Sequence, residues 1–248
     1  MKVSDRLEMV IAAVQKVDCA ADVGTDHGFV PVELVRRGIV KKAIAMDVRP
    51  GPLSRAAEHI RAAGLEKAIE TRLSDGLSGL LAGEARTVVI AGLGGELMIR
   101  ILDEGRHVWD SVEKWVLSPH TDLFKVRKWL WENEFTILKE DMVFETGKYY
   151  TVLVAERLSK GLWDGHTPDF LDCLCGRYLP QTGHPVFFRY IKAEEQKLER
   201  LIERLSGQTP SSLGAARRLS EARKELSLYR RIGESFRKTT QEAEDEMF

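Results

Sequence analysis

The sequence contains few cysteines and no long apolar run. Its three cysteines, Cys19, Cys173 and Cys175, are too few for a disulfide framework, and Cys173 and Cys175 lack the second ligand pair of a zinc site. No apolar segment approaches the roughly 18 residues of a membrane-spanning helix. Charges at Lys2 and Asp5 interrupt the start of the chain, which therefore does not resemble a signal peptide. We expect a cytoplasmic protein with reduced cysteines and no contact with a membrane.

Common signatures of catalysis are missing as well. His, Cys and Asp residues do not cluster at ligand spacing, so we expect no metal, and the sequence has no G-x-S-x-G nucleophile motif. The formal net charge is −1, which argues neither for nor against nucleic acid, so the local distribution of charge has to decide. The length of 248 residues accommodates one α/β domain and a smaller appendage.

Apolar strand-like segments alternate with helical patterns in the first part of the chain. This alternation predicts an α/β fold with a doubly wound, mostly parallel sheet. The expected strands are 19–23, 43–47, 68–73, 87–91 and 114–118, and the expected helices are 28–38, 52–63, 95–104 and 122–132. Segments 134–144 and 149–155 flank a turn at Gly147 and predict an antiparallel hairpin, which makes the last strand of the sheet antiparallel.

The most informative motif, D-x-G-x-D-x-G, spans residues 22–28, where the first expected strand turns into a helix. In the dinucleotide fingerprint G-x-G-x-x-G, a glycine lets the backbone approach a pyrophosphate. Asp26 occupies that approach point here, and its carboxylate would repel a pyrophosphate and favour a cation. S-adenosylmethionine fits this pattern, because it has an ammonium, a sulfonium and a single carboxylate that a helix N-terminus can accept. A generic strand-turn-helix is the alternative.

Carboxylates also follow the next two expected strands. Asp47 lies nineteen residues after Gly28, close to the spacing at which a carboxylate accepts hydrogen bonds from a ribose diol. Its alternative role is to cap the helix that follows. Asp75 could accept a hydrogen bond from the amino group of adenine, although Asp75-Gly76 is also a common turn pair.

A second glycine-rich loop, residues 91–95, follows the fourth expected strand, at the edge where open α/β sheets bind ligands. Three glycines in four residues cost conformational entropy that a simple turn would not require, so we expect the backbone to approach a substrate there. His120 follows the fifth strand and could bind substrate or be a surface or capping residue. The predicted cofactor-binding residues are Asp22, Gly24, Thr25, His27, Asp47, Asp75, Gly76, Ala91 and Gly92, and those predicted to bind substrate at this edge are Gly94, Gly95 and His120.

Together these motifs resemble the bacterial tRNA adenine-N1 methyltransferases that act on adenine-22 of tRNA. The matching segments are 6–7, 22–27 with Pro31, 51–53, 75–77, 91–95, 117–120 and 147–150. Gly28, Ser118 and His120 depart from the residues that are common in the family. The resemblance implies a class I, Rossmann-like methyltransferase domain over residues 1–160. It also implies a helical, coiled-coil-like domain over residues 161–248 that binds tRNA.

The chemistry that this resemblance implies is transfer of the sulfonium methyl group to N1 of adenine. No proton has to leave N1, so positioning and negative charge near the adenine matter more than a general base. Asp26 is the candidate for that charge, and holding the ammonium of the cofactor is its alternative role. A flipped adenine usually stacks on an aromatic ring. Only one of Tyr149 and Tyr150 can face the site on an alternating strand, and we assign Tyr149, with Asp26, the catalytic role.

Basic residues on the last expected helix are the evidence for nucleic acid. Apolar residues at alternating spacings of three and four form a seam for packing on the preceding helix: Leu219, Ala222, Leu226, Tyr229, Gly233 and Phe236. Beside this seam lies a basic flank, defined as Arg217, Arg223, Lys224, Arg230, Arg231 and Lys238. We predict that Arg223, Arg230 and Arg231 contact tRNA. Alternatively, glutamates of the preceding helix such as Glu199 neutralise these arginines, or the hairpin dimerises, which leaves monomer and dimer both open.

Other classes of function also fit parts of the sequence. The protein could methylate another RNA or a small molecule, although the basic flank disfavours a small molecule. It could be a non-catalytic RNA-binding protein with a degenerate cofactor fold, but the intact carboxylates Asp22, Asp47 and Asp75 argue against this reading. A nicotinamide-dependent dehydrogenase is disfavoured by Asp26 and by the antiparallel hairpin.

Overall fold

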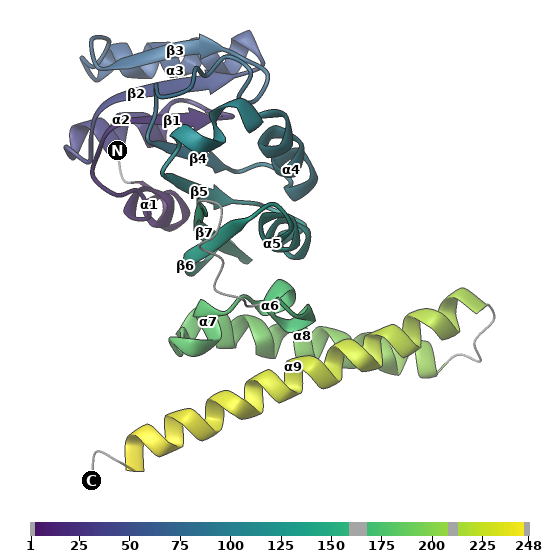
Figure 1. Ribbon diagram of the computed structural model, residues 1–248. Helices are drawn as coiled ribbons and strands as arrows, with labels where there is room; N and C mark the ends of the chain where they lie inside the picture. The colour runs from purple at the N-terminus through teal and green to yellow at the C-terminus, as the bar shows by residue number, and fades with distance from the viewer. Residues whose placement is uncertain (1–2, 159–167, 208–212, 246–248) are drawn as a thin grey trace. The chain divides into compact units, whose positions relative to one another are not determined.

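The computed structural model describes residues 3–158, 168–207 and 213–245 (Figure 1). The chain forms two compact units, Met1–Leu174 and Cys175–Phe248. The domain boundary predicted between residues 160 and 161 lies outside the described residues.

The first unit contains a seven-stranded sheet with the strand order β3-β2-β1-β4-β5-β7-β6. Its strands are β1 (Val17–Val23), β2 (Val40–Asp47), β3 (Ile69–Leu73), β4 (Thr87–Ala91), β5 (Lys114–Ser118), β6 (Phe135–Glu145) and β7 (Lys148–Arg157). Strands β1 to β5 are parallel, whereas β7 runs antiparallel to both β5 and β6. The predicted fold, a mostly parallel sheet with an antiparallel last strand, is confirmed.

The hairpin of β6 and β7 folds so that its second strand lies inside the sheet, next to β5. Its loop consists of Thr146 and Gly147, which have φ angles of 46° and 81°. Two consecutive positive φ angles are typical of the type I′ turn, whose twist matches that of the flanking strands. This tight turn fixes the register that pairs Val143 with Tyr150 and Phe144 with Tyr149.

Helices cover both faces of the sheet (Figure 1). They are α1 (Asp5–Ala12), α2 (Phe29–Arg36), α3 (Pro50–Ala62), α4 (Gly95–Glu104), the 3-10 helix η1 (Arg106–Ser111) and α5 (Leu123–Glu132). A further helix, α6 (Phe170–Cys175), does not lie on the sheet, and its Phe170 contacts Phe124 of α5. Helices α1, α2 and α3 share one core, in which Ile11, Leu34 and Ile60 are buried, and α4 and α5 lie on the opposite face (Figure 1). Because both faces are covered, a central strand such as β4 is apolar at Val88, Val89 and Ile90 in succession.

The second unit contains α7 (Tyr178–Gln181), α8 (Pro185–Ser206) and α9 (Leu213–Asp245). Helices α8 and α9 pack against each other as the predicted hairpin (Figure 1). The side chains buried in it are Phe187, Ile191 and Leu198 of α8 and Ala222, Leu226 and Tyr229 of α9. The predicted seam is therefore present as far as side chains are described, and Phe236 and Lys238 lie beyond that point. Among the described helices, none has both the length and the apolarity needed to cross a bilayer.

Candidate active site

Three carboxylates lie at the carboxyl ends of three neighbouring strands. Asp22 is in β1, Asp47 ends β2, and Asp75 follows the end of β3. Backbone hydrogen bonds join these strand ends: the Gly24 N–H donates to a carbonyl of β2 at 2.8 Å, and the Ser74 N–H donates to the carbonyl of Asp47 at 2.9 Å. The parallel register thus gathers three predicted cofactor-binding residues at the edge where open α/β sheets bind ligands.

Asp22 is buried beneath the first glycine turn. Burial raises the pKa of Asp22 to about 6, the nearby Thr25 hydroxyl opposes this shift, and the negative charge of Asp47 adds to it. The Thr25 hydroxyl is close enough to lower the pKa of Asp22, but it forms no hydrogen bond of normal geometry with any described residue. A buried carboxylate beside an unpartnered buried hydroxyl is expected where a polar, cationic ligand binds.

Asp47 is buried at the end of β2 and is not the N-cap of α3. That position belongs to Arg49, and no side chain caps the helix. The Asp47 carboxylate instead accepts a hydrogen bond from the Arg49 N–H at 2.8 Å, through Oδ1. Within the described parts of the chain, Oδ2 has no hydrogen bond, so this oxygen can accept one from a ligand.

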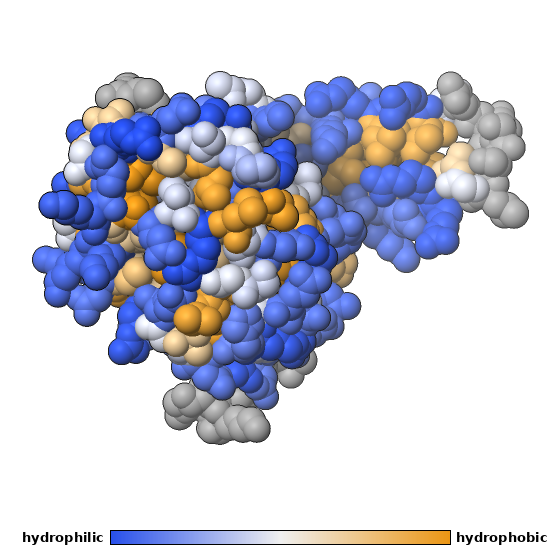
Figure 2. All heavy atoms as spheres, turned by 90° about the horizontal axis from the view of Figure 1, so that it is seen from above, coloured by the Kyte–Doolittle hydropathy of each residue, from blue (hydrophilic) through white to orange (hydrophobic). Residues whose placement is uncertain are grey.

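Apolar side chains are exposed beside these carboxylates, a feature that the sequence analysis missed. Val48 is 56% exposed directly after Asp47, and Leu73 is 61% exposed at the end of β3. Asp75 is half-exposed and pairs with Arg100 of α4 at 3.2 Å. Figure 2 shows other apolar patches that reach the surface between hydrophilic side chains. Apolar surface next to a carboxylate suits a flat heteroaromatic ring with an amino group, such as adenine.

Glycines shape the turns around this edge. Gly24, Gly28 and Gly76 have φ angles of 79°, 64° and 56°, a backbone region that other residues rarely adopt. A Cβ on Gly28 would lie 3.3 Å from that of Ala56, so this glycine also lets α2 approach α3. The backbone carbonyl of His27, another predicted cofactor-binding residue, accepts a hydrogen bond from Nδ1 of a histidine in α3 at 2.9 Å.

Asp26 differs from the other carboxylates of the edge because it is exposed. Its side chain is 67% exposed, and Oδ1 lies 3.2 Å from Arg55 of α3 and 3.6 Å from Nε2 of His27. The structure therefore places the proposed catalytic carboxylate at the surface of the first glycine turn, paired with the guanidinium of Arg55.

The second glycine loop is tied to the loop after β5. The Gly92 N–H donates to the carbonyl of Ser118 at 3.1 Å, and the His120 N–H donates to that of Leu93 at 2.8 Å. A Cβ on Gly95 would lie 2.6 Å from the carbonyl oxygen of Thr121. Only glycine fits there, so Gly95 has a packing reason independent of any substrate.

Gly94 lies in the same contact, and Ala91 ends β4 just before the loop. A Cβ on Gly94 would lie 3.4 Å from Oγ1 of Thr121. A Cβ on Gly92 would instead lie 3.8 Å from the ring of His120 and 3.7 Å from Arg6 of α1. Gly92 is thus the glycine that borders the histidine at the rim.

His120 forms a cluster with two residues from distant parts of the chain. Nε2 of His120 lies 2.6 Å from Nη1 of Arg6, and its ring makes an edge contact with Tyr150, with centroids 5.3 Å apart. The pKa of His120 is lowered, mainly by partial burial of the ring and to a smaller extent by the positive charges of Arg6 and Lys148. The residue as a whole is nevertheless exposed.

The tyrosine beside His120 is Tyr150, whereas the catalytic role predicted from the sequence falls on Tyr149. Tyr149 packs on Phe144, with ring centroids 4.7 Å apart. Side chains alternate along β7, so the two tyrosines point to opposite faces of the sheet, and the Val143–Tyr150 pairing puts Tyr150 on the face that α1 covers. The sequence alone could not fix which of the two faces this rim.

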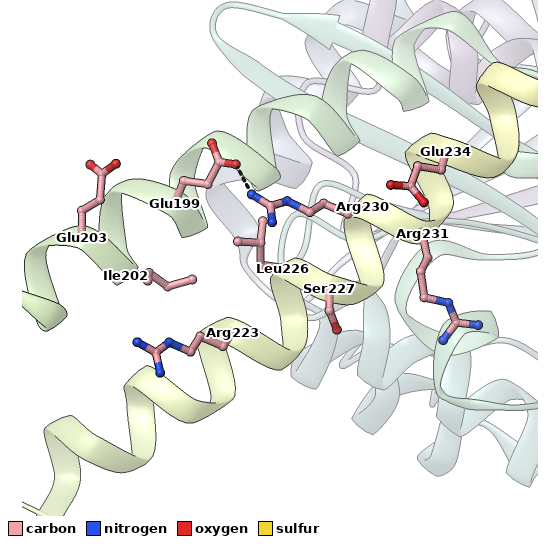
Figure 3. A pocket seen from close by; sticks show the side chains of 9 residues that line it. All are labelled: Glu199, Ile202, Glu203, Arg223, Leu226, Ser227, Arg230, Arg231 and Glu234. Atoms are coloured by element: carbon pink, nitrogen blue, oxygen red, sulfur yellow. Dashed lines mark hydrogen bonds and ion pairs between the residues drawn. The ribbon is translucent and has the colours of Figure 1, made fainter.

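The basic flank of α9 contains both paired and unpaired arginines (Figure 3). Arg230 lies 2.7 Å from Glu199 of α8, which is the neutralisation considered as an alternative. Neither Arg223 nor Arg231 has an ion pair among the described residues. These side chains border a groove with Leu226 at its base.

The thiols lie away from the carboxyl edge. Cys19 is near the start of β1, Cys173 and Cys175 are in α6, and none of these three cysteines is in a disulfide. Burial raises the pKa of Cys19 and Cys173, which disfavours the reactive thiolate. No cluster of three or more metal-ligating side chains occurs in the described ranges.

Comparison with known proteins identifies the class to which this edge belongs. A family model described as a methyltransferase domain matches residues 3–153. Strands β1 to β6, the first part of β7 and the carboxylates at the edge of the sheet fall within this match, so the first unit is a methyltransferase domain.

Full-length relatives narrow the class. The tRNA (adenine(22)-N(1))-methyltransferase of Bacillus subtilis is 31% identical over 207 residues, which cover 83% of this chain and 87% of that protein. The crystal structure of the B. subtilis m1A22 tRNA methyltransferase TrmK matches with a TM-score of 0.81 and 29% identity, over 94% of this chain and 99% of that chain. A Streptococcus pneumoniae structure, solved in complex with S-adenosyl-L-methionine, matches with a TM-score of 0.81 and 31% identity, over 94% and 100%. The chain belongs to the tRNA (adenine(22)-N(1))-methyltransferase family.

Proposed function

We propose that this protein transfers the methyl group of S-adenosylmethionine to N1 of adenine 22 in tRNA, the position named for its B. subtilis relative. The observation that carries the proposal is the row of carboxylates at the ends of β1, β2 and β3, beside a glycine loop at the end of β4. The carboxylates suit a cationic cofactor that contains adenosine, and the glycine loop lets the target base approach this cofactor.

The residues of the carboxyl edge fit the cofactor. Asp22 offers negative charge to a cation, the unpartnered hydroxyl of Thr25 can hydrogen-bond a polar group, and Oδ2 of Asp47 can accept from a ribose hydroxyl. Asp75 can accept from the amino group of adenine beside the apolar surface of Leu73. When bound, S-adenosylmethionine supplies an electrophilic methyl group.

The task of the protein is then to position adenine and stabilise its growing positive charge. The lone pair of N1 attacks the methyl group without losing a proton, so no general base is required. Asp26 can supply negative charge from the first glycine turn, reduced by its ion pair with Arg55, or it can hold the ammonium of the cofactor. Tyr150 offers an aromatic face at the other side of the rim.

We infer that the helical hairpin contributes to tRNA binding. Arg223 and Arg231 present positive charge that no described carboxylate neutralises, as a phosphate backbone requires. A tRNA substrate also implies a cytoplasmic location.

Methyl transfer to tRNA tests the function directly. The protein is incubated with labelled S-adenosylmethionine and unmodified tRNA, and the modified nucleotide is mapped. We expect label at N1 of adenine 22 and none in a transcript with guanine at that position. Transfer to another RNA, transfer to a small molecule, or tRNA binding without any transfer would each contradict the proposal.

A further inference from the structure

Arg6 lies in the first turn of α1, where the loops after β4 and β5 meet. Its Nη1 donates to Nε2 of His120 at 2.6 Å, and its guanidinium carbon lies 5.2 Å from the centre of the Tyr150 ring. Nη1 is also 3.7 Å from the point where a Cβ on Gly92 would lie. Four segments that are far apart in the sequence therefore hold one guanidinium beside the second glycine loop.

Among the residues that the structure describes, no carboxylate forms an ion pair with Arg6. Ten of the twelve arginines in the first unit form an ion pair with a carboxylate, and within the described ranges the exceptions are Arg6 and Arg61. Arg61 is exposed on α3. Glu145 lies beside Arg6, and its carboxylate accepts from the backbone N–H of Arg6 at 3.4 Å rather than from the guanidinium.

His120 orients this guanidinium without cancelling its charge. An arginine side chain only donates hydrogen bonds, so Nε2 of His120 must be the acceptor and the imidazole must be neutral, with its proton on Nδ1. The groups that face the ring, Arg6 from α1 and Lys148 from β7, are both positive and favour the neutral form. Four of the five N–H donors of Arg6 are left for a ligand.

We propose that Arg6 binds a phosphate of the tRNA backbone next to the target adenine and so positions the flipped nucleotide. This inference rests on the proposed function. A guanidinium fork matches the geometry of phosphate oxygens, and a flipped nucleotide carries its phosphates to the rim of the pocket.

The position of Arg6 favours a phosphate of the tRNA, rather than the carboxylate of the cofactor, as its ligand. The carboxylates and the hydroxyl that fit the cofactor are at the ends of β1, β2 and β3, and the N-terminus of α2 follows the first of these strands, although Ala91 and Gly92 at the end of β4 are also predicted to bind the cofactor. Arg6 instead contacts residues at the ends of β4 and β5 and in β7, on the half of the edge that contains the second glycine loop.

The test compares Arg6→Gln, Arg6→Lys and the parent protein. Tritium-labelled tRNA is titrated with S-adenosylhomocysteine present, and methyl transfer is measured separately. Loss of a charge-assisted hydrogen bond should weaken tRNA binding and raise KM for tRNA roughly 10- to 100-fold, while affinity for S-adenosylmethionine and thermal unfolding stay unchanged. Arg6→Lys should recover part of the loss. The matched control is Arg86→Gln, an exposed arginine just before β4, which should change neither value.

A tRNA with one neutral methylphosphonate beside the target adenine supplies the reciprocal test. The neutral group is placed on the 5′ side of the adenine in one tRNA and on the 3′ side in another. If Arg6 contacts one of these two phosphates, neutralising that phosphate should weaken tRNA binding to the parent protein but should not weaken tRNA binding to Arg6→Gln any further. Loss of S-adenosylmethionine affinity in Arg6→Gln, or additive losses for both neutral positions, would overturn the inference. Because tRNA binding is measured without turnover, absence of methyl transfer by the parent would refute the proposed function separately.

Discussion

One arginine–glutamate pair from each unit can be compared, and the two pairs differ in burial rather than in distance. In the first unit, Arg127 of α5 lies 2.8 Å from Glu140 of β6, and their side chains are 1% and 0% exposed. In the hairpin, Arg230 lies 2.7 Å from Glu199, with 55% and 42% exposed. Equal geometry thus has unequal consequences, since water and salt screen the second pair and not the first.

The proposed function needs buried negative charges that bind the cofactor and exposed positive charges that bind tRNA, and these also differ in burial. Asp22 and Asp47 are buried, so their charges act strongly over a short range on one bound cofactor. The arginines of the hairpin are exposed, and their attraction for a polyanion depends on ionic strength. Mutations in the first unit should therefore change stability or cofactor affinity, and those in the hairpin should change the salt dependence of tRNA binding.

The largest effect is expected at the buried pair. Arg127 also donates to the carbonyls of Cys173 and Leu174 at 3.2 and 3.0 Å, which ties the end of α6 to α5. Arg127→Met removes the buried positive charge that faces Glu140 and should lower the free energy of unfolding by about 3–5 kcal/mol. Denaturant unfolding measures this change.

A second substitution shows whether the uncompensated charge is the cause. Arg127→Met with Glu140→Leu should recover much of the lost stability, because no buried charge remains. The exposed control, Arg86→Met, should change the free energy of unfolding by less than about 1 kcal/mol. An equal loss in the single and double variants would mean that packing, not charge, is responsible.

A pH-dependent effect is expected at Asp22. Its folded pKa of about 6 lies above the unfolded value near 3.8, so the folded state favours the neutral carboxyl. The resulting stabilisation is complete below about pH 4 and is lost as the pH rises through 6. Asp22→Asn should therefore be more stable than the parent at pH 7.5. The difference in the free energy of unfolding should be roughly 3 kcal/mol, because the folded and unfolded pKa values differ by about two, and it should be smaller at pH 4. Thermal unfolding across this range measures the difference, and a constant difference would contradict the assigned pKa.

Substitution of Asp47 should weaken cofactor binding, by a smaller free energy than the changes in stability expected at Arg127 and Asp22. Asp47→Ala removes the free carboxylate oxygen and should weaken S-adenosylmethionine binding by about 1–3 kcal/mol, as titration calorimetry would show. Asp75→Ala is the matched comparison, and its loss should be smaller because Asp75 is half-exposed and already paired with Arg100. Binding of both variants at the parental affinity would remove the ribose and adenine assignments.

The sequence predicted the strands of the first unit and helices α2 to α5 well because each of these elements has a local signal. The strands expected at 87–91 and 114–118 agree with β4 and β5, and the hairpin follows from the turn at Gly147. The position of β7 between β5 and β6 was not predicted, because it depends on pairing between strands rather than on local propensity.

The site divides in the same way. The carboxylates Asp22, Asp47 and Asp75 could be placed at one edge because the ends of parallel strands meet there. The cluster of Arg6 with His120 joins residues 114 positions apart, and no spacing rule reaches that far. Whether Tyr149 or Tyr150 faces the rim depends on a register of one residue.

The smallest effect on stability is expected at the exposed pair of the hairpin. Glu199→Gln removes the partner of Arg230 and should change the free energy of unfolding by less than about 1 kcal/mol. If Arg230 faces phosphates, the released arginine should make the salt dependence of tRNA binding steeper by nearly one unit in the slope of log K against log salt. Filter binding at several salt concentrations measures that slope.

Glu33→Gln is the matched control, because it makes the same change in net charge and also removes a carboxylate that pairs with exposed arginines. Glu33 pairs with Arg36 and Arg37 in the first unit, at 2.8 and 3.0 Å. An equal steepening in both variants would show that net charge alone governs the attraction. No change in either slope, with a shift in sedimentation of Glu199→Gln, would assign the basic flank to a protein interface. A steeper slope in Glu199→Gln alone would mean that the carboxylate of α8 competes with phosphate for Arg230, so that the pair limits tRNA affinity instead of supporting the fold.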